Sequence, residues 1–119
     1  MEDKLRFGVF GGGSWGTAIV KMLTENLDQV GWYMRSDSAI RHIIKEGHNP
    51  NYLSSVEFEV SQLHLSHDIN EIVEVSDVLI FAIPSAFLEG ELQQLTASLE
   101  GKIIFSAIKG IVPESGLIV

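Results

Sequence analysis

Four glycines crowd into the six positions Gly11–Gly16, directly after a short apolar run near the start of the chain. Glycine inside a helix or strand costs about 0.5–1 kcal/mol relative to alanine, so such a cluster needs a local structural reason. The apolar run Leu5–Phe10 is typical of a strand, and from Trp15 apolar residues recur at helical spacing to about Glu25. The chain therefore opens with a strand, a glycine-rich turn and a helix.

Within this turn, Gly11, Gly13 and Gly16 have the spacing G-x-G-x-x-G. Between a strand and a helix, this motif is typical of a loop that binds the pyrophosphate of a dinucleotide. Gly11 would make the tight turn, Gly13 would let the pyrophosphate approach, and Gly16 would let the helix pack on the strand. The helix N-terminus adds about 0.3–1 kcal/mol of attraction for an anion, together with free N–H donors. The alternative is a tight turn with a structural role alone.

Strand-like and helix-like segments alternate along the rest of the chain. Apolar patterning predicts further strands over 29–35, 63–66, 78–83 and 102–108. Capping residues predict helices after Ser36, Asp68 and Ser85, of which the first ends at Gly47 and the last runs to about Ser98. Because alternating strands and helices form a parallel sheet covered on both faces, we expect an α/β fold with a doubly wound, Rossmann-type parallel sheet.

The carboxyl ends of the strands are the places where such a fold binds its ligand. The segment 78–83 is apolar throughout, as expected of a strand buried on both faces, and Pro84 ends it. We therefore expect site residues at the ends of the predicted strands, namely at Phe10, Arg35, Ile83–Ser85 and Ile108–Lys109.

Composition and charge limit the classes of protein that this chain can belong to. Its 119 residues are 45% apolar, enough for one domain, residues 1–119, with a real core. There is no cysteine, which excludes disulfides and thiolate metal sites. The net charge is −8, and no lysine or arginine lies between Lys45 and Lys102, so nucleic acid is not expected as a partner. The apolar runs are too short for a signal peptide or membrane insertion, and a cytoplasmic location is the default.

Two cations and two histidines are the candidate polar site residues. Arg35 stands about twenty residues beyond the glycines, where NAD-specific domains usually carry an acidic residue; it would bind a 2′-phosphate, stack on adenine, or lie solvated. Lys109 follows the fifth strand, where it would steady a carbonyl oxygen or a phosphate, or lie solvated.

His64 and His67 have no third ligand in the sequence nearby, so we expect a surface pair and no metal site.

Five short segments carry a resemblance to a known family: "GGGSWGTA", "YMR", "NPNYL", "AIPSAFL" and "IKGI". In order and spacing they resemble the N-terminal portion of the NAD(P)-dependent glycerol-3-phosphate dehydrogenases, over nearly the whole chain. The resemblance implies NADP or NAD as the cofactor and an oxidoreductase activity. The cofactor or substrate contacts that it implies, beside the glycines, are Ser14, Trp15, Arg35, Tyr52, Pro84 and Lys109, with Phe87 near the nicotinamide. From the residues alone, Trp15 would equally serve packing, and Tyr52 and Phe87 a core or lid.

The resemblance also implies a reaction, and it implies that residues 1–119 are only the N-terminal part of the enzyme that carries it out. Members of this family reduce dihydroxyacetone phosphate to sn-glycerol 3-phosphate for glycerophospholipid synthesis, and Lys109 would be the catalytic residue that holds substrate and developing charge. The proton donor and the substrate-phosphate site lie in a later helical domain, so we expect residues 1–119 to be incomplete and inactive alone. The apolar ending "SGLIV" favours self-association, a possible homo-oligomer. The rival interpretation is a non-catalytic dinucleotide-binding module, such as a redox sensor or regulatory subunit.

Overall fold

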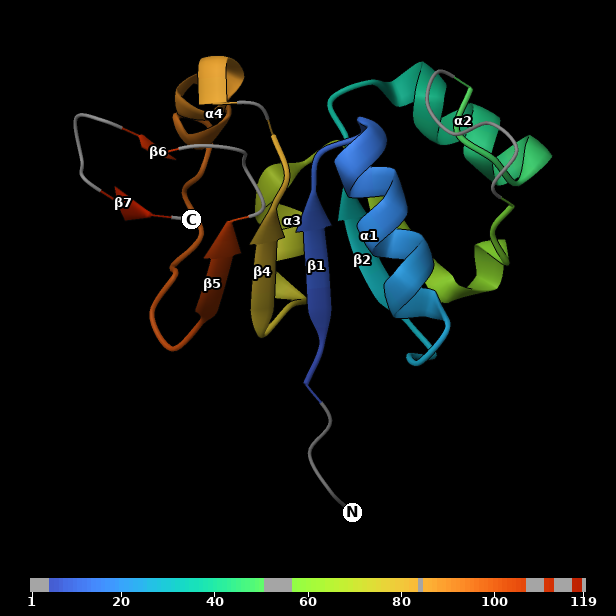
Figure 1. Ribbon diagram of the computed structural model, residues 1–119, viewed down its shortest axis with the longest axis horizontal. Helices are drawn as coiled ribbons and strands as arrows, with labels where there is room; N and C mark the ends of the chain where they lie inside the picture. Colours follow the sequence, from blue (N-terminus) through green and yellow to red (C-terminus); the bar gives the residue numbers. More distant parts are fainter. Residues whose placement is uncertain (1–4, 51–56, 84, 107–110, 113–116, 119) are drawn as a thin grey trace.

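Five parallel strands form the central sheet of the computed structural model (Figure 1), which describes residues 5–50, 57–83, 85–106, 111–112 and 117–118. The strand order is β3-β2-β1-β4-β5, and every pairing in this sheet is parallel. The strands are β1 (Phe7–Phe10), β2 (Val30–Tyr33), β3 (Leu63–Ser66), β4 (Val78–Phe81) and β5 (Ile103–Ser106). The helices are α1 (Ser14–Thr24), α2 (Asp37–Glu46), α3 (Ile69–Glu74) and α4 (Ser85–Leu92), with a 3₁₀ turn, η1, at Val60–Gln62. Two short strands, β6 (Ile111–Val112) and β7 (Leu117–Ile118), pair antiparallel in a second sheet.

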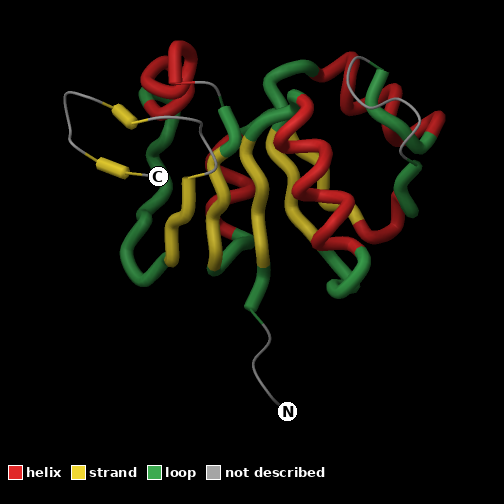
Figure 2. The backbone as a smooth tube through the Cα atoms, in the orientation of Figure 1, coloured by secondary structure: helices red, strands yellow, loops and turns green. Residues whose placement is uncertain are grey.

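Helices cover both faces of the sheet, as Figure 2 shows. Successive side chains of a strand point to opposite faces, so β1 sends Val9 into one apolar cluster and Phe10 into the other. The first cluster joins β1 and β2 to α1 and α2, and the second joins the other face to α3 and the segment after α4. This arrangement confirms the doubly wound parallel sheet that the alternation of segments predicts.

The order of the strands reverses at β1, which pairs with β2 on one side and with β4 on the other. The chain builds outward from β1 to β3, then returns to place β4 against the free edge of β1. The loops that leave the carboxyl ends of β1 and β4 therefore diverge, one toward each face, and a crevice opens between them. The glycine-rich loop begins at this point, directly after Phe10.

The capping residues act as the sequence predicts. The Ser36 hydroxyl accepts a hydrogen bond from the Ala39 backbone N–H (3.1 Å), and Gly47 ends α2 in a left-handed conformation. The Asp68 carboxylate accepts the Asn70 N–H (3.0 Å) at the start of α3. The structure does not describe the side chain of Ser85, so the capping role expected of this residue stays a prediction.

The predicted extent of α4 is wrong, because the helix ends at Leu92 rather than near Ser98. The cause is a side chain from α3. The Asn70 amide donates to the Gln94 carbonyl (3.1 Å), and its oxygen accepts from the N–H groups of Thr96 (2.6 Å) and Ala97 (2.9 Å). Backbone groups that would continue the helix are thereby bound to a distant side chain.

The predicted strands 29–35 and 78–83 are likewise shorter in the structure, at Val30–Tyr33 and Val78–Phe81, so β4 ends before Pro84. The predicted strand 102–108 begins one residue late, at Ile103, and its predicted end at residues 107 and 108 lies outside the described chain. Within the described residues, no helix combines the length and apolar character that a membrane crossing requires.

Candidate functional site

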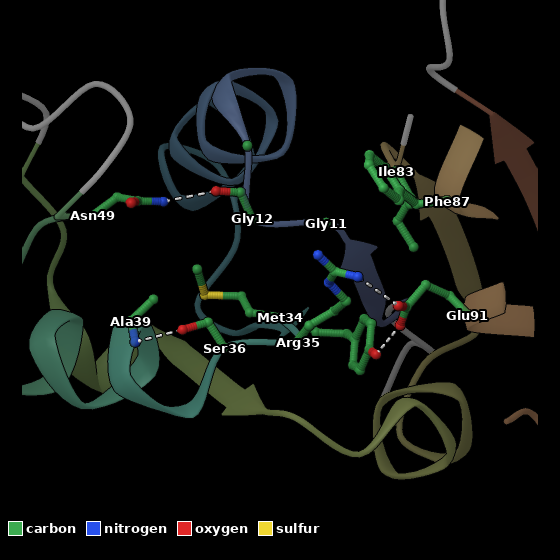
Figure 3. Close-up of a pocket in the computed structure, with 12 residues that line it drawn as sticks. Gly11, Gly12, Met34, Arg35, Ser36, Ala39, Asn49, Ile83, Phe87 and Glu91 are labelled. Atoms are coloured by element: carbon green, nitrogen blue, oxygen red, sulfur yellow. Dashed lines mark hydrogen bonds and ion pairs between the residues drawn. The ribbon is translucent and has the colours of Figure 1, made fainter. Parts of the chain in front are cut away.

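A pocket of about 320 Å³ lies where the loops after β1, β2 and β4 meet (Figure 3). The glycine loop, Gly11 to Gly13, forms one wall. The end of β2 and the start of α2 form the second, and Ile83 with two side chains of α4 forms the third. The pocket therefore sits outside the carboxyl ends of the strands, at the reversal of strand order where parallel α/β sheets bind ligands.

Two glycines of the loop are required by its backbone geometry. Gly11 has a φ of 133°, a left-handed conformation that side chains rarely tolerate, and a Cβ there would lie 2.7 Å from the Ala82 carbonyl oxygen. A Cβ on Gly16 would lie 2.1 Å from the Gly11 carbonyl oxygen, so α1 packs on the loop only because this side chain is missing. These are the turn-making and packing roles that the sequence predicts for Gly11 and Gly16.

Gly13 is different, because no atom lies within 4 Å of the position that its Cβ would take. Gly13 lines the pocket and is the N-cap of α1, where no side chain caps the first-turn N–H groups. Open space in front of uncapped helix N–H donors is what an anion binding at a helix N-terminus requires. The loop therefore leaves room at the N-terminus of α1, and the pyrophosphate contact that the glycine spacing predicts for Gly13 stays a prediction.

Two side chains that sequence reasoning did not select hold this loop in place. Asn49, which is fully buried, donates through Nδ2 to the Gly12 carbonyl oxygen (2.9 Å) and to Thr17 Oγ1 (3.0 Å). The indole N–H of buried Trp32 donates to the Gly11 carbonyl oxygen (2.8 Å). Both contacts hold carbonyl groups of the loop against the protein, and the Gly11 N–H donates to the Tyr33 carbonyl oxygen (2.9 Å), so the loop is fixed to the end of β2 as well.

Tyr33, Arg35, Phe87 and Glu91 line the pocket together. In Figure 3, Arg35, Phe87 and Glu91 lie on the side of the glycine loop opposite Asn49. Arg35 Nη1 lies 3.6 Å from Glu91 Oε2, and the Arg35 guanidinium lies 5.4 Å from the centre of the Phe87 ring. The Tyr33 hydroxyl donates a short hydrogen bond to Glu91 Oε1. Burial, and then this hydrogen bond to Glu91, raise the pKa of Tyr33, so its hydroxyl remains a donor at neutral pH.

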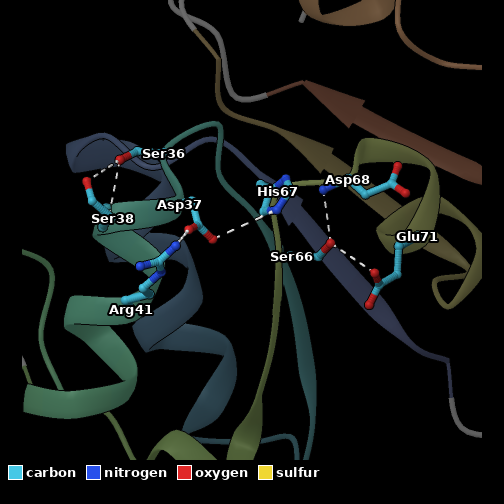
Figure 4. Close-up of polar contacts among 9 residues, drawn as sticks. Ser36, Asp37, Ser38, Arg41, Ser66, His67, Asp68 and Glu71 are labelled. Atoms are coloured by element: carbon cyan, nitrogen blue, oxygen red, sulfur yellow. Dashed lines mark hydrogen bonds and ion pairs between the residues drawn. The ribbon is translucent and has the colours of Figure 1, made fainter.

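A second polar network lies beside the pocket, over the ends of β2 and β3 (Figure 4). Asp37 pairs with Arg41 one turn along α2, and His67 Nε2 lies 3.8 Å from the other Asp37 oxygen. His64 pairs with Glu71 (2.5 Å), and this contact lowers the pKa of the Glu71 carboxyl. The two histidines thus bind different carboxylates, and the described part of the chain contains no group of three potential metal ligands.

The remaining predicted site residues fall into two groups. Ser14 and Trp15 begin α1 and are exposed; the Trp15 side chain, 57% exposed, is not packed in the core. Tyr52, Pro84 and Lys109 lie outside the described residues. Phe87, which the resemblance implies near the nicotinamide, lies beside Arg35, and its role stays a prediction.

Known proteins with a similar sequence or fold include members of the family that the sequence resembles. The family model of the NAD-dependent glycerol-3-phosphate dehydrogenase N-terminus matches residues 6–119. A glycerol-3-phosphate dehydrogenase (NAD(P)+) of Ectopseudomonas mendocina is 34% identical over 93% of this chain and 32% of its own length, and one of Pseudomonas syringae pv. tomato is 36% identical over 97% and 33%. The crystal structure of glycerol-3-phosphate dehydrogenase from Coxiella burnetii superposes with a TM-score of 0.77 at 26% identity, over 96% of this chain and 35% of that one.

The chain spans about a third of the length of the curated relatives that it matches. The match covers almost all of the chain, including the glycine loop and the strand ends around the pocket. The chain therefore belongs to the family formed by the N-terminal part of the NAD-dependent glycerol-3-phosphate dehydrogenases.

Proposed function

We propose that this chain binds NAD or NADP, with the pyrophosphate over the glycine loop at the N-terminus of α1. The observation that carries this proposal is the open space at Gly13 in front of uncapped helix N–H groups. Gly11 and Gly16 support it, because each is needed to bring the helix N-terminus to the carboxyl end of β1. The relatives that match the chain are named for the same two cofactors.

The adenosine half of the cofactor is proposed to extend from the loop toward the end of β2, where Arg35 and Ser36 line the pocket. In dinucleotide-binding folds the residue at this strand end contacts the adenosine ribose or its 2′-phosphate. Phe87 lies beside Arg35, with its ring centre 5.4 Å from the guanidinium, and the place near the nicotinamide that the family resemblance implies for it stays a proposal. Ser14, Trp15, Tyr52 and Pro84 are proposed as further cofactor contacts on the strength of the family resemblance.

For the whole protein we propose the reduction of dihydroxyacetone phosphate to sn-glycerol 3-phosphate, in glycerophospholipid synthesis. The nicotinamide supplies a hydride when the cofactor is bound. In this chain, Lys109 is proposed to hold the substrate and the negative charge that develops on its carbonyl oxygen. The proton donor and the substrate-phosphate site are proposed to lie outside residues 1–119. The cytoplasmic location and a homo-oligomeric state stay predictions.

Gly13→Val tests the cofactor site, because it places a branched side chain where the pyrophosphate is proposed to lie. Gly90→Val in α4 is the matched control, since a Cβ there also meets nothing within 4 Å and Gly90 does not line the pocket. In isothermal titration calorimetry, NADH should bind the Gly13→Val chain at least about ten-fold more weakly than wild type, or not measurably, whereas Gly90→Val should bind normally.

Thermal unfolding of both variants separates a blocked site from a damaged fold. We expect Gly13→Val to keep a cooperative transition, because its new side chain meets no protein atom at Cβ. Unchanged NADH affinity in a folded Gly13→Val chain would refute the placement of the pyrophosphate on this loop.

A further inference from the structure

The pocket contains a buried carboxylate that the proposed function does not use. The Glu91 side chain is only 5% exposed, yet it lines the pocket. Its two oxygens have different partners from the end of β2: the Tyr33 hydroxyl binds Oε1, and Arg35 lies 3.6 Å from Oε2. Figure 3 shows α4 placing this side chain directly opposite the strand end. Glu91 is therefore held in a fixed position by a residue 58 positions away in the sequence.

The position of this carboxylate bears on the choice between the two cofactors. NADP differs from NAD by a phosphate on the 2′-hydroxyl of the adenosine ribose, and the end of the second strand is where folds of this type distinguish them. NAD-specific domains usually carry an acidic residue at that strand end, whereas this chain has Arg35 there. The fold, however, brings an acidic group to the same place from α4.

Arg35 is already engaged in the structure. Its side chain is 64% exposed, and its guanidinium group reaches both Glu91 (3.6 Å) and the face of the Phe87 ring (5.4 Å to the ring centre). A 2′-phosphate that bound Arg35 would compete with Glu91 for the guanidinium and would bring a second negative charge close to the carboxylate. Because Glu91 is buried, solvent screens this repulsion far less than it would between surface groups.

We propose that Glu91 is a specificity-determining residue, which disfavours dinucleotides that carry a 2′-phosphate. NAD meets neither the competition for Arg35 nor the repulsion, because its ribose carries a neutral hydroxyl group at this position. Tyr33 is the positioning residue, since its hydrogen bond fixes the Glu91 carboxylate toward β2. This inference rests on the proposed function, namely that the pocket binds the adenosine half of a dinucleotide.

Charge removal at Glu91 tests the proposal. Glu91→Gln keeps an acceptor for the Tyr33 hydroxyl and removes only the charge. Glu89→Gln is the matched control, because Glu89 is exposed on the same helix and does not line the pocket. Dissociation constants of NADH and NADPH are measured by calorimetry for the wild-type chain and for each variant. The readout is the ratio of the two constants, which a purely structural defect would leave unchanged.

The wild-type chain should bind NADH more tightly than NADPH. Glu91→Gln should shift the ratio toward NADPH by about ten-fold, the scale of one charge-assisted hydrogen bond, and Glu89→Gln should leave it near the wild-type value. In an Arg35→Gln background, Glu91→Gln should shift the ratio less, because the freed guanidinium is absent.

Two outcomes would overturn the inference: an unchanged ratio in Glu91→Gln, including the case in which both cofactors weaken equally, or an equal shift of the ratio in Glu89→Gln. If neither cofactor binds the wild-type chain, the proposed function fails as well, so the two failures are distinguishable. Should Glu91→Gln not fold, the double variant Tyr33→Phe, Glu91→Met removes both partners of the buried hydrogen bond and gives the same comparison.

Discussion

Single side chains from distant parts of the sequence shape the pocket at the glycine loop. Gly11, Gly13 and Gly16 could be assigned roles from spacing alone, because their function is local: a turn, an opening and a close contact within six residues. Asn49 and Glu91 could not, because their partners lie 37 and 58 residues away. A buried asparagine and a buried glutamate look like loop and helix-surface residues until the fold brings them to the pocket.

Asn49→Ala should destabilise the chain and loosen the glycine loop. The change removes the hydrogen bonds that Nδ2 donates to the Gly12 carbonyl oxygen and to the Thr17 hydroxyl. We expect the free energy of unfolding in urea to fall by about 1–3 kcal/mol. Asn26→Ala is the control, since Asn26 is exposed, and its effect should stay within about 0.5 kcal/mol. Equal effects of the two substitutions would contradict the assigned role of Asn49.

At the scale of elements, the sequence predicts which segments form and the structure decides where they end. Strand β4 is buried as its unbroken apolar run predicts, and α2 begins and ends at its predicted caps. Helix α4 ends six residues early, because Asn70 of α3 binds the backbone that would have continued it. Periodicity describes the neighbours of a residue along the chain, so it cannot report a hydrogen bond from another helix.

The starts of β1 and β4 are joined by an ionic contact whose pH dependence can be measured. The Arg6 guanidinium and backbone N–H both donate to the Asp77 carboxylate, and these bonds lower the pKa of Asp77. A carboxyl group with a lowered pKa in the folded state stabilises the fold above its unfolded pKa and loses that contribution as the pH falls through its folded pKa. The stabilisation should therefore be present at neutral pH and disappear below about pH 4.

Asp77→Asn should remove this part of the pH dependence. Chemical unfolding at pH values between 2 and 7 should show the variant less stable than wild type at neutral pH, with the two curves converging in acid. Asp28→Asn, at an exposed carboxyl before β2, is the control and should leave the curve near that of wild type. Parallel curves for Asp77→Asn and wild type would show that the contact with Arg6 has no energetic effect.

In the whole molecule, the residues that line the pocket gather at the carboxyl ends of the parallel strands. The glycine loop, the end of β2 and the start of α4 all lie at the carboxyl ends of the strands (Figure 1), although Gly11 and Ser85 are 74 positions apart in the sequence. The strand order β3-β2-β1-β4-β5 brings them together. The doubly wound parallel sheet could be predicted, because the alternation of strands and helices has few stable arrangements. We expect a dinucleotide to bind across the carboxyl ends of these strands, with its pyrophosphate at the N-terminus of α1.

Backbone amide chemical shifts report this binding mode residue by residue. In a chain labelled with ¹⁵N and titrated with NADH, we expect saturable shift changes that are largest at Gly11, Gly13, Ser14 and Trp15, with a second group at Arg35 and Ser36. Amides of α3, on the face of the sheet away from α1, should change little. Saturable changes confined to α3 or β5, or no changes at the glycine loop at millimolar NADH, would contradict this binding mode.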